Sequence, residues 1–96
     1  MNRTAYVAGK ITGLSRPHVK EKFSQISDRL KGMGYHVVQP VGVTTEDHEW
    51  EDNIRYDIKK MLECDELHML PDWQESRSAK LERDIALRLG MQVVYH

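Results

Sequence analysis

The chain has 96 residues, of which 40% are hydrophobic and 30% charged, and its formal net charge is -1 at pH 7. This balance is typical of a soluble globular domain and excludes a disordered chain, a membrane protein and a basic domain that binds a nucleic-acid polymer. The sequence opens with no basic-then-apolar leader, and no apolar run approaches the roughly 20 residues of a membrane span, so we expect a cytoplasmic protein.

The chain begins with a predicted strand and a loop. Residues Thr4–Ala8 form a compact apolar run that predicts a strand, and the loop Gly9–Arg16 follows it. Ser15 is a suitable N-cap for the next helix, and Pro17 suits its first turn.

The first predicted helix has one apolar stripe. Gly32 and Gly34 are expected to end it, and residues Tyr35–Gln39 predict a second strand that Pro40 closes. The stripe consists of Val19, Phe23, Ile26, Leu30 and Met33.

The middle of the chain predicts a long connection, a helix and a buried strand. The connection, Val41–Glu49, has no clear period and is expected to pass over the C-terminal edge of the sheet. The helix begins near Trp50, and the strand Glu66–Leu70 ends at Pro71. The apolar stripe of this helix consists of Trp50, Ile54, Ile58, Met61 and Leu62.

The last predicted helix covers about Ser78–Leu89, and Gly90 stops it before the final strand Met91–Tyr95. Its expected apolar face consists of Leu81, Ile85 and Leu89.

Strands therefore alternate with helices over a single domain, residues 1–96. Right-handed crossovers predict a three-layer, flavodoxin/Rossmann-like α/β fold, in which a parallel four-stranded sheet of order 2-1-3-4 has helices on both faces. Ligands of such sheets bind beyond the carboxyl ends of the strands, where the strand order reverses. We expect that crevice between the loops Gly9–Arg16 and Asp72–Ala79.

Two acidic residues have both a functional and an ordinary interpretation. Glu82 follows the second crevice loop and is predicted to point inward, although it could equally be a surface residue paired with Lys80 or Arg83. Asp57 borders the buried face of its helix, and it could instead pair with Arg55 or Lys60.

Aromatic residues near the crevice are also candidates. Tyr6 lies in a short strand, where a core position is the simplest interpretation. Trp50 fits its helix stripe as a core residue, whereas Trp73 lies in the crevice loop and could stack on a base. The lone Cys64 and the scattered histidines lack metal-ligand spacing, so we expect no metal and no cofactor.

Four stretches together resemble the nucleoside 2-deoxyribosyltransferase superfamily, most closely its small phage and bacterial relatives of unassigned function. The resemblance covers nearly the whole chain. The stretches are Tyr6-Val7-Ala8-Gly9-Lys10, Asp57 with Cys64-Asp65, Ser76 to Glu82, and Ala86 to Val93.

The resemblance implies roles for individual residues. Glu82 corresponds to the nucleophile that attacks the anomeric carbon, Asp57 to the assisting acid/base and Tyr6 to the residue that orients the glutamate. Such a carboxylate splits glycosidic substitution into two steps through a glycosyl-enzyme ester. The predicted substrate-binding residues are Gly9, Lys10, Ser15, Arg16, Trp73, Ser76, Arg77 and Ser78.

The sequence departs from the base-exchanging transferases at two places. Ser76 occupies the position of an aspartate that reads the base, and Ser78-Ala79 replaces Gly-Thr. A serine here looks more like the branch that hydrolyses 2'-deoxynucleoside 5'-monophosphates, in which serines and an arginine hold the phosphate. Lys10, Ser15 and Arg16 near a helix N-terminus also favour an anion.

Two functions from different classes follow. The first is an enzyme of the N-glycosidic bond of a nucleotide or nucleoside, and the second is a non-catalytic module that senses or sequesters a nucleotide in the same crevice. In either case the resemblance implies a homodimer or a higher homo-oligomer.

Overall fold

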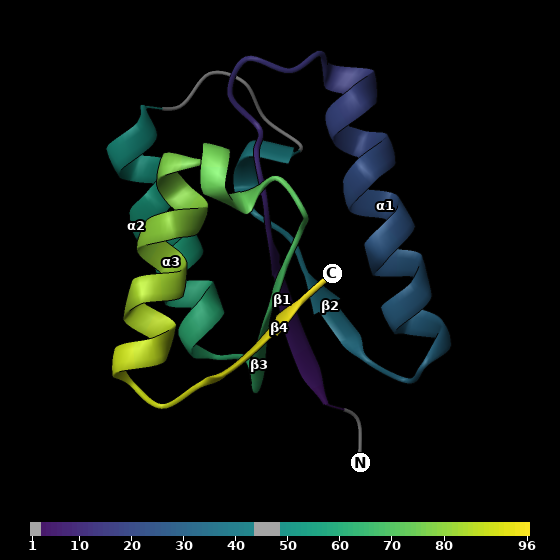
Figure 1. The fold of residues 1–96 in the computed structure, drawn as a ribbon, viewed down its shortest axis with the longest axis vertical. Coiled ribbons are helices and arrows are strands. Elements are labelled where there is room, and N and C mark those ends of the chain that lie inside the picture. Colours follow the sequence, from purple (N-terminus) through teal and green to yellow (C-terminus); the bar gives the residue numbers. More distant parts are fainter. Residues whose placement is uncertain (1–2, 44–48) are drawn as a thin grey trace.

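The computed structural model describes residues 3–43 and 49–96 and contains a four-stranded parallel sheet between two helical layers (Figure 1). The strand order β2-β1-β3-β4 confirms the predicted 2-1-3-4 arrangement, a flavodoxin-like topology. Part of the predicted connection Val41–Glu49, residues 44–48, lies outside the described residues. The strands are β1 (Thr4–Ala8), β2 (His36–Val38), β3 (Glu66–Met69) and β4 (Gln92–Tyr95); the α-helices are α1 (Arg16–Gly32), α2 (Trp50–Leu62) and α3 (Arg77–Arg88); the short 3-10 helices are η1 (Val41–Val43) and η2 (Trp73–Glu75).

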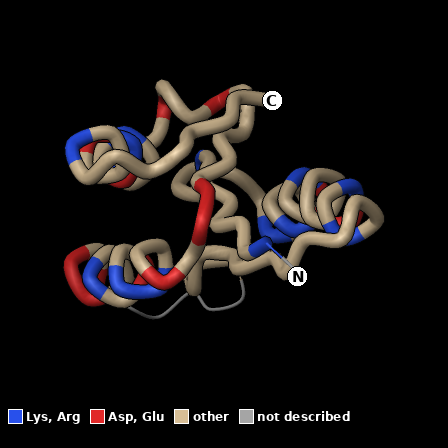
Figure 2. The backbone as a smooth tube through the Cα atoms, turned by 90° about the horizontal axis from the view of Figure 1, so that it is seen from below, with Lys and Arg blue, Asp and Glu red and all other residues tan. Residues whose placement is uncertain are grey.

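The two faces of the sheet carry separate cores. Helix α1 covers one face, and α2 and α3 cover the other, as the view from below shows (Figure 2). Alternation along β1 divides its side chains: Ala5 and Val7 pack beneath α1, whereas Tyr6 and Ala8 pack beneath α2 and α3. Tyr6 therefore faces the layer that carries both candidate acids.

Serine caps mark the starts of α1 and α3, and the predicted Ser15 cap of α1 is confirmed. The Ser15 hydroxyl accepts a hydrogen bond from the His18 N–H at 3.3 Å, and the Ser76 hydroxyl accepts one from the Ala79 N–H at 3.0 Å. At the end of α1, Gly34 adopts a φ of +94°, which a residue with a Cβ rarely reaches. With Ser76 as its cap, helix α3 begins at Arg77, one residue earlier than predicted.

The predicted apolar stripes are wrong at four positions. Met33, Leu62, Leu81 and Leu89 are exposed, and Leu89 reaches 62%. Helix α3 instead buries Ala79, Glu82 and Ala86, three residues at helical spacing. Small alanines let the helix lie close to the sheet, and this face carries Glu82 inward while the leucines stay outside. Among the described residues, no helix is long and apolar enough to cross a membrane.

Candidate functional site

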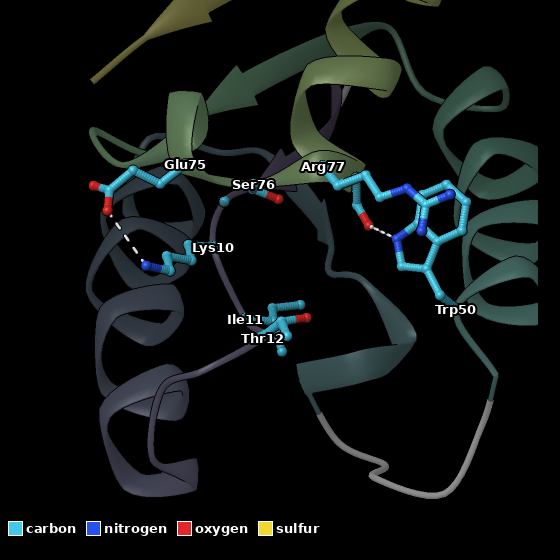
Figure 3. Close-up of a pocket in the computed structure, with 9 residues that line it drawn as sticks. Lys10, Ile11, Thr12, Trp50, Glu75, Ser76 and Arg77 are labelled. Carbon is cyan, nitrogen blue, oxygen red and sulfur yellow. Dashed lines mark hydrogen bonds and ion pairs between the residues drawn. The ribbon is translucent and has the colours of Figure 1, made fainter.

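The crevice lies where β1 and β3 end side by side. Ala8 is in register with Met69, so the loops that follow the two strands leave the sheet together. They enclose a cavity of about 410 Å³, as predicted from the strand order (Figure 3). The cavity is lined by Gly9, Lys10, Ile11, Thr12, Trp50, Glu75, Ser76, Arg77 and Ser78.

Gly9 is required at the floor of this crevice. A Cβ on Gly9 would collide with the Leu70 side chain at the end of β3. The glycine therefore lets the two strand ends approach each other, which is a packing reason for its place in the predicted site.

A smaller cavity of about 60 Å³ adjoins the crevice. It shares Gly9, Ile11, Thr12, Trp50 and Ser78 with the larger one, and Asp57 and Glu82 form part of its wall. The inner cavity thus brings together two carboxyl groups from different helices, α2 and α3, next to the crevice.

Glu82 is buried and has an unsatisfied oxygen. Its side chain is 2% exposed, so the alternative of a surface residue paired with Lys80 or Arg83 is wrong. Within the described residues, Glu82 Oε2 has no hydrogen-bond partner. Burial raises the pKa of this carboxyl from 4.5 to about 8; the nearby Tyr6 hydroxyl opposes the rise and the Asp57 charge adds to it.

Asp57 is the second buried acid. It is 5% exposed and accepts a hydrogen bond from the Val41 N–H at 2.9 Å, which ties α2 to the segment after β2. Burial raises its pKa from 3.8 to about 6, and the Val41 N–H limits the rise. Lys60, one of its suggested partners, pairs with Glu63 at 3.9 Å.

Tyr6 lies beneath the two acids. Burial, and then the charges of Glu82 and Asp57, raise the pKa of its phenol well above 10. The Tyr6 hydroxyl acts on Glu82 electrostatically, but no hydrogen bond of ordinary geometry joins it to any described residue. Tyr6 is therefore a core residue whose polar end is free to orient a carboxylate or a ligand.

Trp50 forms one side of the crevice, which the sequence did not predict because this ring fits the apolar stripe of its helix. Its Nε1–H donates to the Ser78 hydroxyl at 2.7 Å, and the Arg77 guanidinium lies 3.5 Å from the ring centre (Figure 3). The signal was present: a tryptophan at the first turn of a helix that follows a crevice-side connection.

Lys10 and Glu75 form the opposite side. The Lys10 ammonium pairs with the Glu75 carboxylate at 3.3 Å (Figure 3). The Lys10 N–H also donates to Asp72 Oδ1 at 3.0 Å, so Asp72 holds the β1–α1 loop in place. The cavity consequently has one cation on each side, Lys10 and Arg77.

Three predicted binding residues lie elsewhere or serve the fold. Ser15 caps α1, and Arg16 donates to the Gly42 carbonyl oxygen at 3.1 Å; neither lines the two cavities described above. Trp73 packs against Tyr95, with the Arg83 guanidinium over its ring, and does not line them either. A substrate contact from these residues stays a prediction.

The site therefore combines two acids of unequal pKa, a buried phenol and a crevice with cations on both sides. Such a pair of carboxyl groups can divide nucleophilic and proton-transfer roles. No cluster of three or more His, Cys, Asp or Glu side chains suited to a metal ion occurs in residues 3–43 and 49–96.

The family described as "Domain of unknown function (DUF4406)" matches residues 3–95. This match includes every residue of the crevice and of the inner cavity. No curated protein matches the chain.

Proposed function

The chain therefore belongs to the DUF4406 family, and we propose that it is an enzyme of the N-glycosidic bond, with Glu82 as its nucleophile. The reaction is hydrolysis or deoxyribosyl transfer, in line with the resemblance to the nucleoside 2-deoxyribosyltransferase superfamily. The single observation that carries this proposal is the buried Glu82 carboxyl with an unpartnered oxygen on the wall of a cavity that adjoins the crevice.

The two acids hold about one proton between them at neutral pH. Their pKa values of about 6 for Asp57 and about 8 for Glu82 leave the ligand-free pair with a single shared negative charge. A positive charge that develops on the sugar beside Glu82 favours the ionised form of this carboxyl. The proton then resides on Asp57, which is the distribution that the reaction needs.

The reaction proceeds in two balanced steps. A Glu82 oxygen attacks the anomeric carbon, the carbon–nitrogen bond breaks, and Asp57 donates its proton to the departing base. Asp57 next removes a proton from water, or from an incoming base, which attacks the same carbon and releases Glu82. The Tyr6 hydroxyl orients the Glu82 carboxylate throughout.

The substrate class that we propose is a 2'-deoxynucleoside 5'-monophosphate. Arg77 supplies positive charge on one side of the crevice, and Lys10 on the other side can turn to an anion in place of its exposed partner Glu75. Ser76 lies between them at the N-terminus of α3, where an anion is favoured (Figure 3). Arg77 already covers the Trp50 ring, so a base that stacks on Trp50 has to displace this guanidinium.

A binding titration and a base-release assay on the four common 2'-deoxynucleoside 5'-monophosphates test the proposal. We expect the wild-type protein to release a free base, and Glu82→Gln to bind the same compound while losing release on the order of a thousandfold or more. Asp57→Asn should lose about a hundredfold to ten-thousandfold. Glu51→Gln, an exposed glutamate of α2, is the matched control and should behave as wild type.

The same assay decides between the enzyme and the non-catalytic module. Tight binding by the wild-type protein with no base released would refute the enzyme. Release that disappears in Glu82→Gln while binding remains would refute the module.

A further inference from the structure

A second cavity, of about 440 Å³, lies on the other face of the sheet beneath α1. We call it the α1-side cavity. Its lining residues are Lys22, Gln25, Ile26, Arg29, Leu70, Pro71, Asp72 and His96, none of which lines the crevice.

The charged groups of the α1-side cavity favour an anion. Lys22 is already paired with Asp72, so these two charges largely cancel. The Arg29 guanidinium has no hydrogen bond or ion pair with the part of the chain that the structure describes, so among the lining side chains it is the positive charge left without a partner. Ile26 and Leu70 of the adjoining core also line this cavity, which suits a ligand with both a charge and an apolar body.

A hydrogen-bonded row of three side chains, Glu66, His68 and His96, leads from the sheet to this cavity. The buried Glu66 Oε1 lies 2.8 Å from His68 Nε2, and His68 Nδ1 lies 2.8 Å from His96 Nε2. Burial acts against the ionised form of Glu66, but hydrogen bonds from His68 and Tyr35 and the charge of Arg3 outweigh it and lower the pKa of Glu66. An ionised Glu66 requires a proton on His68 Nε2.

This row of hydrogen bonds determines the protonation of the His96 Nδ1 atom. When both rings are neutral, His68 Nδ1 accepts from the His96 Nε2–H, and the lone pair of His96 Nδ1 is left. Burial, and then the neighbouring His68 and Arg29, lower the pKa of His96, so the ring is neutral at pH 7. Protonation of His96 converts Nδ1 into a charged donor, and a bound anion favours this form.

We propose that the α1-side cavity is a second ligand site that binds an organic anion, a carboxylate or a phosphate on an apolar body, between Arg29 and His96. It differs from the crevice in position and in residues, and it does not depend on the function proposed for Glu82.

Asp72 connects this site to the crevice. Its Oδ2 accepts from the Lys22 ammonium in the α1-side cavity, and its Oδ1 accepts from the Lys10 N–H at the crevice. Burial works against its charge, but both contacts together lower the pKa of Asp72. An anion that attracts Lys22 competes directly with Asp72, so occupation of the α1-side cavity changes the hydrogen bond that holds Lys10.

Titrations of the full chain with benzoate and with phenyl phosphate, followed by amide and imidazole NMR signals, test the site. We expect saturable binding that Arg29→Glu weakens about tenfold or more. Lys20→Glu makes the same charge change at an exposed position of α1 outside the cavity and should leave binding within about twofold. The tighter of the two ligands identifies the head group.

The pH dependence and the signal of the Lys10 amide complete the test. Benzoate keeps its charge above pH 5.5, so a change of affinity between pH 8 and 5.5 reports on the protein. We expect the affinity to rise as the pH falls over this range and expect His96→Gln to lose this rise. A benzoate-dependent shift of the Lys10 amide signal also supports the site. The groups that face His96 are His68, Arg29, Lys22 and Asp72. Absence of saturable binding, or equal losses in Arg29→Glu and Lys20→Glu, would overturn the proposal. Because none of these readouts involves base release, they fail or succeed independently of the proposed enzyme.

Discussion

The Glu82 carboxyl is held away from water without a full set of hydrogen bonds, and such burial has an energetic consequence. The folded protein prefers the neutral acid, whereas the unfolded chain ionises near pH 4.5. Stability from this group is therefore fully present below pH 4.5 and is lost as the pH rises through about 8. The candidate nucleophile is thus also a destabilising group at alkaline pH.

Glu82→Gln should remove that pH dependence. We expect the wild-type protein to lose unfolding free energy between pH 6 and 8, on the scale of about 1.4 kcal/mol per pH unit below the pKa, and to level off above pH 8, while the variant stays nearly level throughout. Denaturant unfolding at several pH values measures the difference. A wild-type curve parallel to that of Glu82→Gln over this range would show that Glu82 is already ionised at pH 6.

At the scale of single elements, Ser76 has two structural roles, and different substitutions affect them separately. Its hydroxyl caps α3, and its side chain lines the crevice. Ser76→Ala should cost about 1 kcal/mol of stability through loss of the cap, whereas Ser76→Asp keeps a capping oxygen. The aspartate should weaken binding of a 5'-monophosphate by repulsion and leave binding of the unphosphorylated nucleoside unchanged. Thermal unfolding and parallel titrations of both ligands measure these effects; equal loss for both ligands would contradict a phosphate near Ser76.

Helix α3 shows how far sequence patterns extend. Its approximate position and the inward direction of Glu82 could be predicted from turn chemistry and chain order, whereas its Ser76 cap was not predicted. Its apolar face could not, because the large leucines suggested a buried stripe where the structure buries Ala79 and Ala86. Close packing of a helix on a sheet depends on side-chain size in three dimensions, which the apolar period alone does not contain.

Contacts between distant segments mark the other limit of the sequence analysis. The strand order and the crevice loops could be predicted, and they brought Gly9, Lys10 and Arg77 together. The contact of Trp50 with Ser78 joins two helices. The hydrogen-bonded side chains Glu66, His68 and His96 join β3 to the far end of the chain. No local pattern records such pairs, because their spacing follows from the assembled sheet.

At the scale of the whole molecule, the two proposed ligand sites are the crevice beyond the ends of β1 and β3 and the α1-side cavity, and Asp72 contacts residues of both. The central strands β1 and β3 of this sheet are buried on both sides, and close packing opposes movement of their side chains. We therefore expect any signal between the proposed sites to pass through Asp72 and the loop ends instead of the strands.

The homodimer implied by the resemblance stays a prediction, and α3 is the surface on which we expect it. Leu81, Leu87 and Leu89 are exposed apolar side chains of α3 and the residue just after it. Leu89→Glu should convert a dimer into a monomer, whereas Met33→Glu, an equally exposed apolar position on α1's C-terminal side, should not. Light scattering after size exclusion measures the mass; a monomeric wild-type protein at micromolar concentration would contradict the assignment.

The most direct measurement is the mass of the Glu82 peptide after rapid acid quenching of the wild-type protein with a 2'-deoxynucleoside 5'-monophosphate. We predict a peptide that gains the mass of the deoxyribose phosphate group, with the attachment at Glu82, and no such gain in Glu82→Gln treated with the same substrate. A quenched protein that has released base but carries no sugar on Glu82 at any time point would contradict the covalent mechanism.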